Sequence, residues 1–260
     1  MNKLKWSVLL IVFGIIFTNP GVGQTGWMDF AEETLKKVTK SDNKVSGAEL
    51  AGLSQNEITM GLKEALIVGF KKAIALLGKD GGYLNDAKVK IPMPGLLSHA
   101  ETALRSAGQG EVADQFIKTM NSAAEKAIPV TADIFADAIR NLTVKDAQAI
   151  LQGPNDAATQ YFKRTSGKTL TKAIRPIVEN STKKVGLTSA YKSLTGVVGE
   201  KMGFLSGIMG QDSLDLDGYV TQKGIDGLFL KLAEEEARIR ANPMARGSDI
   251  LKKVFGSVSL

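Results

Sequence analysis

Helix start and stop signals dominate this sequence, and they constrain its fold more than any other feature. Ser54 and Glu57 have the spacing of a capping box, and apolar residues follow at steps of three and four up to Gly78. Residues 111–127 repeat this periodicity, and residues 143–146 look like another helix start. Alternating strand patterns are almost absent, so the sequence predicts a compact all-α fold.

Further helices are expected in the second half of the chain. Asn155 or Asp156 is placed to cap a helix that continues through Phe162. Residues 168–184 carry another apolar stripe, with Pro176 in its interior, where proline removes a backbone donor. Residues 217–241 form the last long stretch of this kind, with Asp217 as its expected cap, and residues 248–256 suggest a short final helix.

Helical spacing also predicts which side chains face outward. On residues 111–127, Val112, Phe116 and Met120 share one side, while Asn121 and Glu125 fall on the side expected to face solvent. We therefore expect both polar side chains to lie on the surface.

Two segments depart from the helical pattern. Residues 80–94 combine a turn-rich loop with Pro92 and Pro94, which predicts an extended segment, with a short hairpin as the alternative. Residues 196–210 are apolar but have a glycine every few positions, which suggests an irregular lid or hinge. No linker divides the rest, so residues 54–256 are expected to form one domain.

The start of the chain has the composition of a signal peptide. Lys3 and Lys5 precede an apolar run over residues 6–17, and small residues at 21–23 suit cleavage before Gln24. The run is shorter than the roughly 20 residues that span a bilayer. We expect residues 1–23 to be removed, 24–53 to hold a short helix, and the mature chain to be soluble, exported and periplasmic rather than membrane-spanning.

The residues that the chain lacks exclude several kinds of site. It has no cysteine and a single histidine, His99, which excludes disulfides, thiolate metal sites, cysteine nucleophiles and any site with two imidazoles. Residues 212–218 resemble a calcium loop only loosely, because the terminal glutamate is missing. No nucleophile elbow, phosphate-binding loop or dinucleotide fingerprint occurs. We therefore expect no metal and no cofactor, and we identify no catalytic residue.

Positive charge is concentrated in residues 163–201, which contain nine Lys or Arg residues and only two Glu. Lys168, Lys172 and Arg175 have helical spacing that places them on one side. This segment has two interpretations: an ordinary solvated helix face, or a face that attracts an anionic ligand, an acidic protein or a lipid surface. We expect no nucleic-acid partner, because the chain carries an export signal and aromatic residues do not alternate with these charges. Arg164, Lys172 and Arg175 are the basic binding candidates.

Glu235 is the polar residue with the most unusual position. It lies three residues after Leu232 and four before Ile239, within the apolar stripe of its expected helix. A buried carboxylate needs a cation, hydrogen-bond donors or a proton. We expect Arg175 or Arg164 as its partner. Three roles remain open: a buried ion pair, a carboxylate that lines a pocket, and a general base.

Several short stretches resemble a known family. They are residues 64–66 with 68–69, 123–125 after Asn121, 156–162, 219–221, 226–229, 233–236 and 251–256. In these the chain resembles an exported bacterial family of unknown function, DUF4197, over residues 54–256. The resemblance implies a helical exported protein, and it gives weight to five residues as pocket candidates: Asp156, Thr159, Tyr161, Asp226 and Glu235.

Three functional hypotheses follow. The first is an exported helical protein that binds or scaffolds an anionic or amphiphilic ligand, or an acidic partner, at residues 163–201. The second is a cofactor-free enzyme that uses Glu235, and the third is a structural protein of the cell envelope. The sequence favours binding over catalysis.

Overall fold

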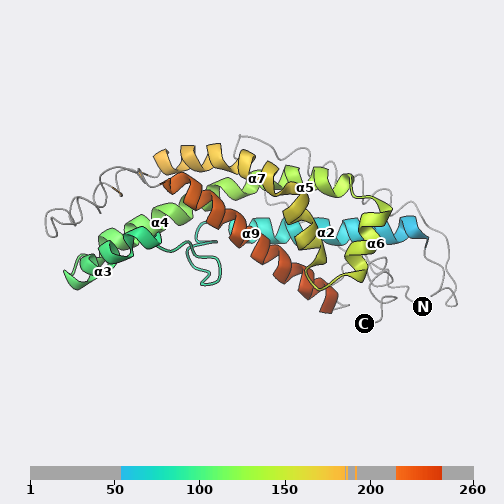
Figure 1. Cartoon of the computed structure of the whole chain (residues 1–260), viewed down its shortest axis with the longest axis horizontal. Helices are drawn as coiled ribbons and strands as arrows, with labels where there is room; N and C mark the ends of the chain where they lie inside the picture. The colour runs from blue at the N-terminus through green and yellow to red at the C-terminus, as the bar shows by residue number, and fades with distance from the viewer. Residues whose placement is uncertain (1–53, 185, 187–190, 192–214, 242–260) are drawn as a thin grey trace, which may run out of the picture.

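The computed structural model describes residues 54–184, 186, 191 and 215–241, which form an elongated helical bundle (Figure 1). These residues contain helices and turns but no strand, which confirms the all-α prediction. The alternative hairpin in residues 80–94 does not form: residues 79–89 are mainly turns, and residues 90–94 are neither helix nor strand.

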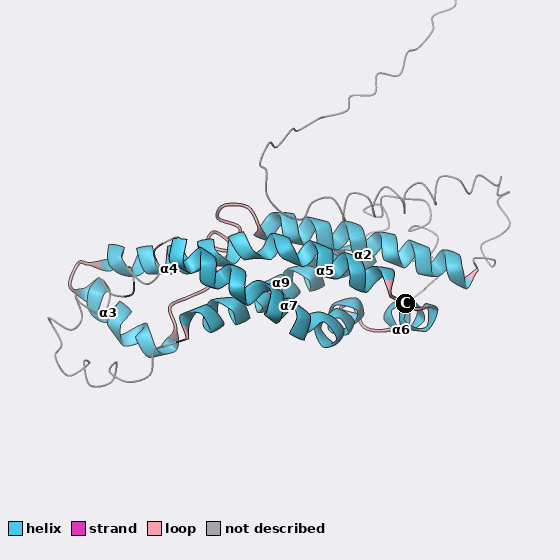
Figure 2. Ribbon diagram, turned by 90° about the horizontal axis from the view of Figure 1, so that it is seen from above, coloured by secondary structure: helices cyan, strands magenta, loops and turns pink. Residues whose placement is uncertain are grey.

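Among the described residues, four helices are long and three are shorter. The long helices are α2 (Gln55–Leu77), α4 (Gly110–Ala127), α7 (Ala157–Lys184) and α9 (Leu216–Ala241). The shorter helices are α3 (Ser98–Ser106), α5 (Thr131–Arg140) and α6 (Val144–Gln152), with single 3-10 turns at Gly95–Leu97 and Ile128–Val130. Helix α9 packs against α7, α2 and α4, and Figure 2 shows α2, α9 and α7 side by side along the long axis.

Local signals fix the helix boundaries where the sequence predicted them. Ser54 and Glu57 form both bonds of the capping box at the start of α2, and Gly78 ends that helix. Thr143 and Asp146 form a second capping box at α6. These side chains satisfy backbone donors that have no partner within the helix, so their positions define where a helix can begin.

Helix α7 differs from the prediction in its length and in its cap. It runs without interruption over residues 157–184, where the sequence predicted one helix through Phe162 and a second over residues 168–184 with Pro176 inside it. The amides of Ala158 and Thr159 in its first turn donate to Glu236 of α9, not to Asp156. Asp156 instead accepts a bond from the side chain of Gln160. A carboxylate from a distant helix thus stabilises this start.

The start of α9 also has a different cap from the one expected. Asp215, not Asp217, accepts the Gly218 amide at 2.8 Å, and its carbonyl accepts the Tyr219 amide. Asp217 instead accepts the hydroxyl of Thr182 on α7 at 2.7 Å. Asp215 therefore caps the start of α9, and Asp217 joins α9 to α7.

Four phenylalanines from four helices meet at the centre of the bundle. Phe70 of α2 lies edge-on to Phe135 of α5 and Phe162 of α7, with ring centroids 4.7 and 5.1 Å apart. Phe229 of α9 meets Phe135 in the same way at 6.2 Å. All four rings are buried, and edge-to-face contacts of this kind add to the free energy gained by burial.

Two polar side chains of α4 hold residues 79–94 in place, although helical spacing predicted that both would lie on the surface. Glu125 accepts the amides of Gly81, Tyr83 and Leu84, and Asn121 exchanges two hydrogen bonds with the backbone of Ile91. Both side chains are buried. The prediction was wrong here because this segment covers the side of α4 that helical spacing alone assigns to solvent.

Tyr83 inserts from this segment into a notch on α9. Its hydroxyl donates to the carbonyl oxygen of Gly224 at 2.6 Å, and burial raises its pKa, so the hydroxyl keeps its proton. A Cβ atom at Gly227 would lie 2.8 Å from the Tyr83 ring and 3.1 Å from Val89. Glycine is therefore required at this position of the helix for the segment to approach.

Several predictions concern parts of the chain outside the described residues. These are the signal peptide over residues 1–23, the short helix within 24–53, the glycine-rich stretch at 196–210 and the helix at 248–256. Among the helices that the structure does describe, none combines the length and apolarity needed to cross a membrane.

Candidate functional site

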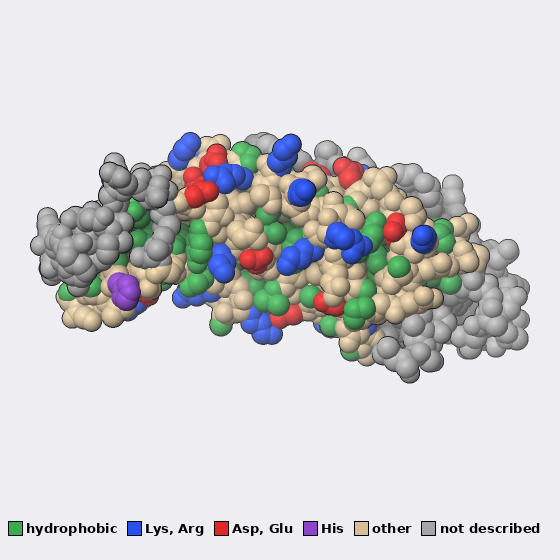
Figure 3. Space-filling view, viewed as in Figure 1, with side chains coloured by type: hydrophobic (Ala, Val, Ile, Leu, Met, Phe, Trp, Pro, Cys, Tyr) green, Lys and Arg blue, Asp and Glu red, His purple; other side chains and the backbone are tan. Residues whose placement is uncertain are grey.

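The basic residues of α7 line a hollow on its exposed side. The hollow measures about 380 Å³, and the residues that line it are Lys168, Thr171, Lys172, Arg175, Pro176 and Glu179. Figure 3 shows Lys and Arg side chains along the α7 edge of the molecule, with acidic side chains beside them. The sequence predicted that three of these cations would share a side, and they do.

The three cations of the hollow differ in what they already bind. Arg175 pairs with Glu179 at 3.0 Å and with Asp215 at 3.0 Å. Across the described ranges, Lys168 and Lys172 make no ion pair and no side-chain hydrogen bond. Two ammonium groups are therefore available at this surface, while the guanidinium anchors the start of α9.

The Arg175–Asp215 ion pair should make the stability of the protein depend on pH. The amide of Gly218, and then Arg175, hold the pKa of Asp215 below the ordinary value. A lowered folded pKa stabilises the protein above the unfolded pKa of about 3.9, and this contribution is lost as the pH falls through the folded pKa. We expect Asp215→Asn to be less stable than wild type near neutral pH, by under about 1 kcal/mol because the site is exposed, and equally stable near pH 2.

The measurement is the free energy of unfolding in urea over a pH series. Asp226→Asn is the matched control, because Asp226 is exposed and, within the described part of the chain, its side chain bonds only Gln222, at 3.0 Å. A difference between Asp215→Asn and wild type that did not change with pH would contradict the assignment.

Glu235 is buried as predicted, but its partners are not the ones expected. It pairs with Lys72 of α2 at 2.8 Å and with Arg238 of its own helix at 2.7 Å. Arg175 and Arg164 are engaged elsewhere, the first with Asp215 and the second over the ring of Tyr161 at 5.7 Å. Glu235 thus joins α9 to α2 rather than to α7.

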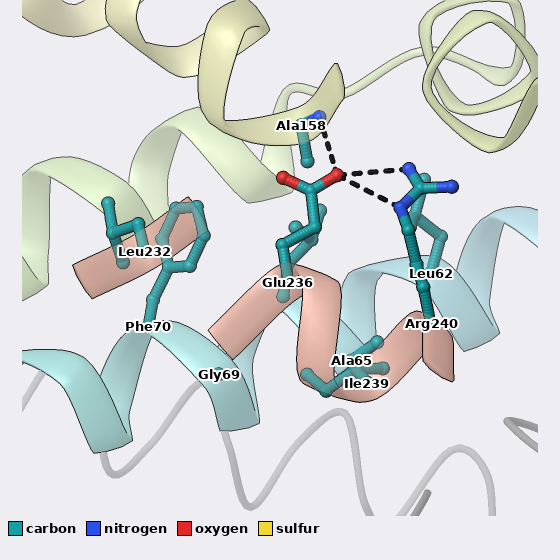
Figure 4. A pocket seen from close by; sticks show the side chains of 10 residues that line it. Leu62, Ala65, Gly69, Phe70, Ala158, Leu232, Glu236, Ile239 and Arg240 are labelled. Carbon is teal, nitrogen blue, oxygen red and sulfur yellow. Dashed lines mark hydrogen bonds and ion pairs between the residues drawn. The ribbon is translucent and has the colours of Figure 1, made fainter. Parts of the chain in front are cut away.

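The neighbouring Glu236 occupies a position that sequence reasoning missed. Besides the two amides of α7, it accepts the Thr159 hydroxyl at 2.8 Å and pairs with Arg240 at 2.9 Å. Arg240 in turn donates to the carbonyl of Ile150 at the end of α6 at 2.8 Å. Figure 4 shows this pair between the helix ends. The sequence shows that Glu236 and Arg240 are four residues apart on a helix, but not that the pair is buried.

A small cavity lies beside Glu236. Its volume is about 20 Å³, and it is lined mainly by apolar residues of α2 and α9, namely Leu62, Ala65, Leu66, Gly69, Phe70, Leu232 and Ile239, with Ala158, Glu236 and Arg240 (Figure 4). A space of this size holds about one water molecule. Glu235 does not line it, so the cavity brings no candidate ligand to that residue.

The remaining candidates do not gather in one place. Burial raises the pKa of Tyr161, with the charge of the nearby Asp146 as the second cause. Asp156 and Asp226 each hold a nearby glutamine side chain. None of these, nor Arg164, lines the α7 hollow. Thr159 belongs to the cap around Glu236.

Within residues 54–184 and 215–241, no group of three or more carboxylate or histidine side chains could hold a metal ion.

No curated protein and no solved structure matches the chain. The family described as "Protein of unknown function (DUF4197)" matches residues 52–256, which include every described helix. The chain therefore belongs to the DUF4197 family.

Proposed function

We propose that this protein is an exported binding protein that holds an anionic ligand in the hollow on α7. The observation that carries the proposal is the pair Lys168 and Lys172, which face a hollow of about 380 Å³ and have no acidic partner in the described part of the chain. Known ligand pockets begin at about 300 Å³. The leader-like composition of residues 1–23 supports export.

Binding is favoured over catalysis because the best candidate bases are engaged. Glu235 is held by Lys72 and Arg238, and Glu236 by two amides, a hydroxyl and Arg240. A general base has to be within reach of a substrate proton. The cavity beside Glu236 holds about one water, which leaves no room for a substrate.

The test is the mass of the mature chain purified from its exported compartment, measured under native and denaturing conditions. The denatured mass reports whether residues 1–23 are removed. We expect the native mass to include a small anion that Lys168→Glu/Lys172→Glu loses, because the substitution reverses both free charges. Arg175 is left intact, since its replacement would also disturb the start of α9.

The control is Lys118→Glu/Lys126→Glu, which makes the same charge change at exposed positions of α4. It should keep the ligand. A wild-type chain that carries no small molecule, and that binds no added phosphate or citrate in calorimetry, would contradict the proposal. A bound mass of protein size would instead identify an acidic partner.

A further inference from the structure

We propose that the α7 hollow selects a small phosphate monoester that carries a hydroxyl group, the chemistry of a polyol phosphate. The inference rests on the proposed function above and specifies its ligand. Three properties of the hollow carry it: the number of free positive charges, a backbone carbonyl without its usual donor, and the size of the space.

The free charges favour a dianion. Lys168 and Lys172 lie four residues apart on one helix, where side chains are neighbours and like charges repel. The third cation, Arg175, already has two carboxylate partners. A phosphate monoester carries a charge of about −1.5 to −2 at neutral pH, which matches two ammonium groups. A monoanion leaves one of them uncompensated.

The backbone beside these lysines favours a hydroxyl group. Pro176 has no N–H, so the carbonyl oxygen of Lys172, four residues earlier, lacks the donor that an α-helix normally supplies. Both residues line the hollow. Thr171, which also lines it, uses its hydroxyl proton on the carbonyl of Gly167 at 3.0 Å, so its oxygen is left as an acceptor. A ligand hydroxyl can donate to these oxygens, whereas a bare phosphate ester cannot.

The size of the hollow favours a small molecule over a lipid surface. A volume of about 380 Å³ lies at the lower end of the range of small-molecule sites, about 300–1,000 Å³. The cations that face it come from about two turns of one helix. Such a short stretch can contact a phosphate and a few carbons but not an extended lipid surface, so the soluble ester is the expected ligand.

Calorimetric titration of the mature chain with three probes tests this inference at about pH 8, where a monoester is fully dianionic. The probes are glycerol phosphate, propyl phosphate, which lacks hydroxyls, and glycerophosphoglycerol, a diester that has hydroxyls but one charge. We expect glycerol phosphate to bind about tenfold more tightly than either of the others, the size of effect expected for one hydrogen bond or one charge.

Two variants separate the two contacts. Pro176→Ala restores an N–H for the Lys172 carbonyl, so it should reduce the affinity for glycerol phosphate toward that for propyl phosphate and leave the latter unchanged. Lys168→Gln/Lys172→Gln should lower the affinity for both monoesters at least tenfold. Lys118→Gln/Lys126→Gln, with the same change in net charge, should leave both unchanged.

The outcomes distinguish this inference from the proposed function. Equal binding of all three probes, with the lysine variant still impaired, would overturn the ligand class and leave an anion site. Binding only to phosphatidylglycerol vesicles would overturn the soluble ligand in favour of a membrane surface. No binding to any anion, or equal loss in the α4 control, would overturn both.

Discussion

Glu236→Ala is expected to lower the free energy of unfolding by about 3–5 kcal/mol, the cost of breaking a buried ion pair from one side. The Glu236 side chain is 7% exposed and pairs with Arg240, whose side chain is 11% exposed. It also accepts the first amides of α7. The substitution removes the Glu236 carboxylate from the largely buried Arg240 guanidinium and takes away the acceptor of two amides. Urea unfolding followed by circular dichroism measures the loss.

Glu234→Ala is the matched control on the same helix. Glu234 pairs with Lys88 and Lys231, but it is about one third exposed, and pairs of this kind contribute about 0–1 kcal/mol. Glu236→Gln, which keeps the shape and loses the charge, should lie between the two. If Glu236→Ala lowered the free energy of unfolding no more than Glu234→Ala does, the contacts of Glu236 and Arg240 with α7 and α6 would not contribute to stability in solution.

Glu125→Ala is expected to have the second largest effect, about 3 kcal/mol. Its two carboxylate oxygens accept the amides of Gly81, Tyr83 and Leu84 at 3.0–3.2 Å, and the side chain is buried. Leaving one buried donor unsatisfied costs about 1–3 kcal/mol, and water entering the opened site recovers part of the total. We therefore expect a loss that is large and centred on residues 79–94.

Hydrogen exchange locates this effect. The amides of residues 81, 83 and 84 should exchange faster in Glu125→Ala, while the amides of α7 keep their protection. Gln115→Ala, an exposed substitution on the same helix, should change neither stability nor exchange by a measurable amount. Unchanged exchange of these three amides in Glu125→Ala would show that the carboxylate does not hold the segment.

Local signals explain why the fold class and several helix boundaries could be predicted from the sequence. A capping box acts within four residues, so the starts of α2 and α6 are encoded where they occur. The stop at Gly78 is equally local. Helix α7 begins directly after Asp156, one of the two predicted caps, but its first amides donate to Glu236 of another helix and not to the Asp156 side chain, which no local signal could show.

Burial of polar side chains could not be predicted, because it depends on what covers a helix. Helical spacing separates one side of α4 from the other, but it does not show that residues 79–94 lie across the second side and bury Asn121 and Glu125. Glu235 was recognised because it lies within an apolar stripe. Its partner Lys72 is 163 positions away in sequence, and no local pattern connects the two.

The candidate site was predictable only in part, for the same reason. The spacing of Lys168, Lys172 and Arg175 follows from the geometry of one helix, and they line one hollow. The pairing of Arg175 with Asp215 depends on how α9 meets α7, which the sequence did not reveal. This pairing separates the two available lysines from the arginine that serves as an anchor.

The contacts of α9 also determine when this chain can complete its folding during synthesis. Three side chains or carbonyls of α9 accept hydrogen bonds from earlier parts of the chain. Glu236 accepts an amide of α7, the Gly224 carbonyl accepts the Tyr83 hydroxyl, and Asp217 accepts the Thr182 hydroxyl. As the chain leaves the ribosome from its N-terminus, these three bonds cannot form until α9 has been made. Until then the emerging chain is an incomplete bundle whose exposed apolar surface favours aggregation, and its core closes only once α9 has formed.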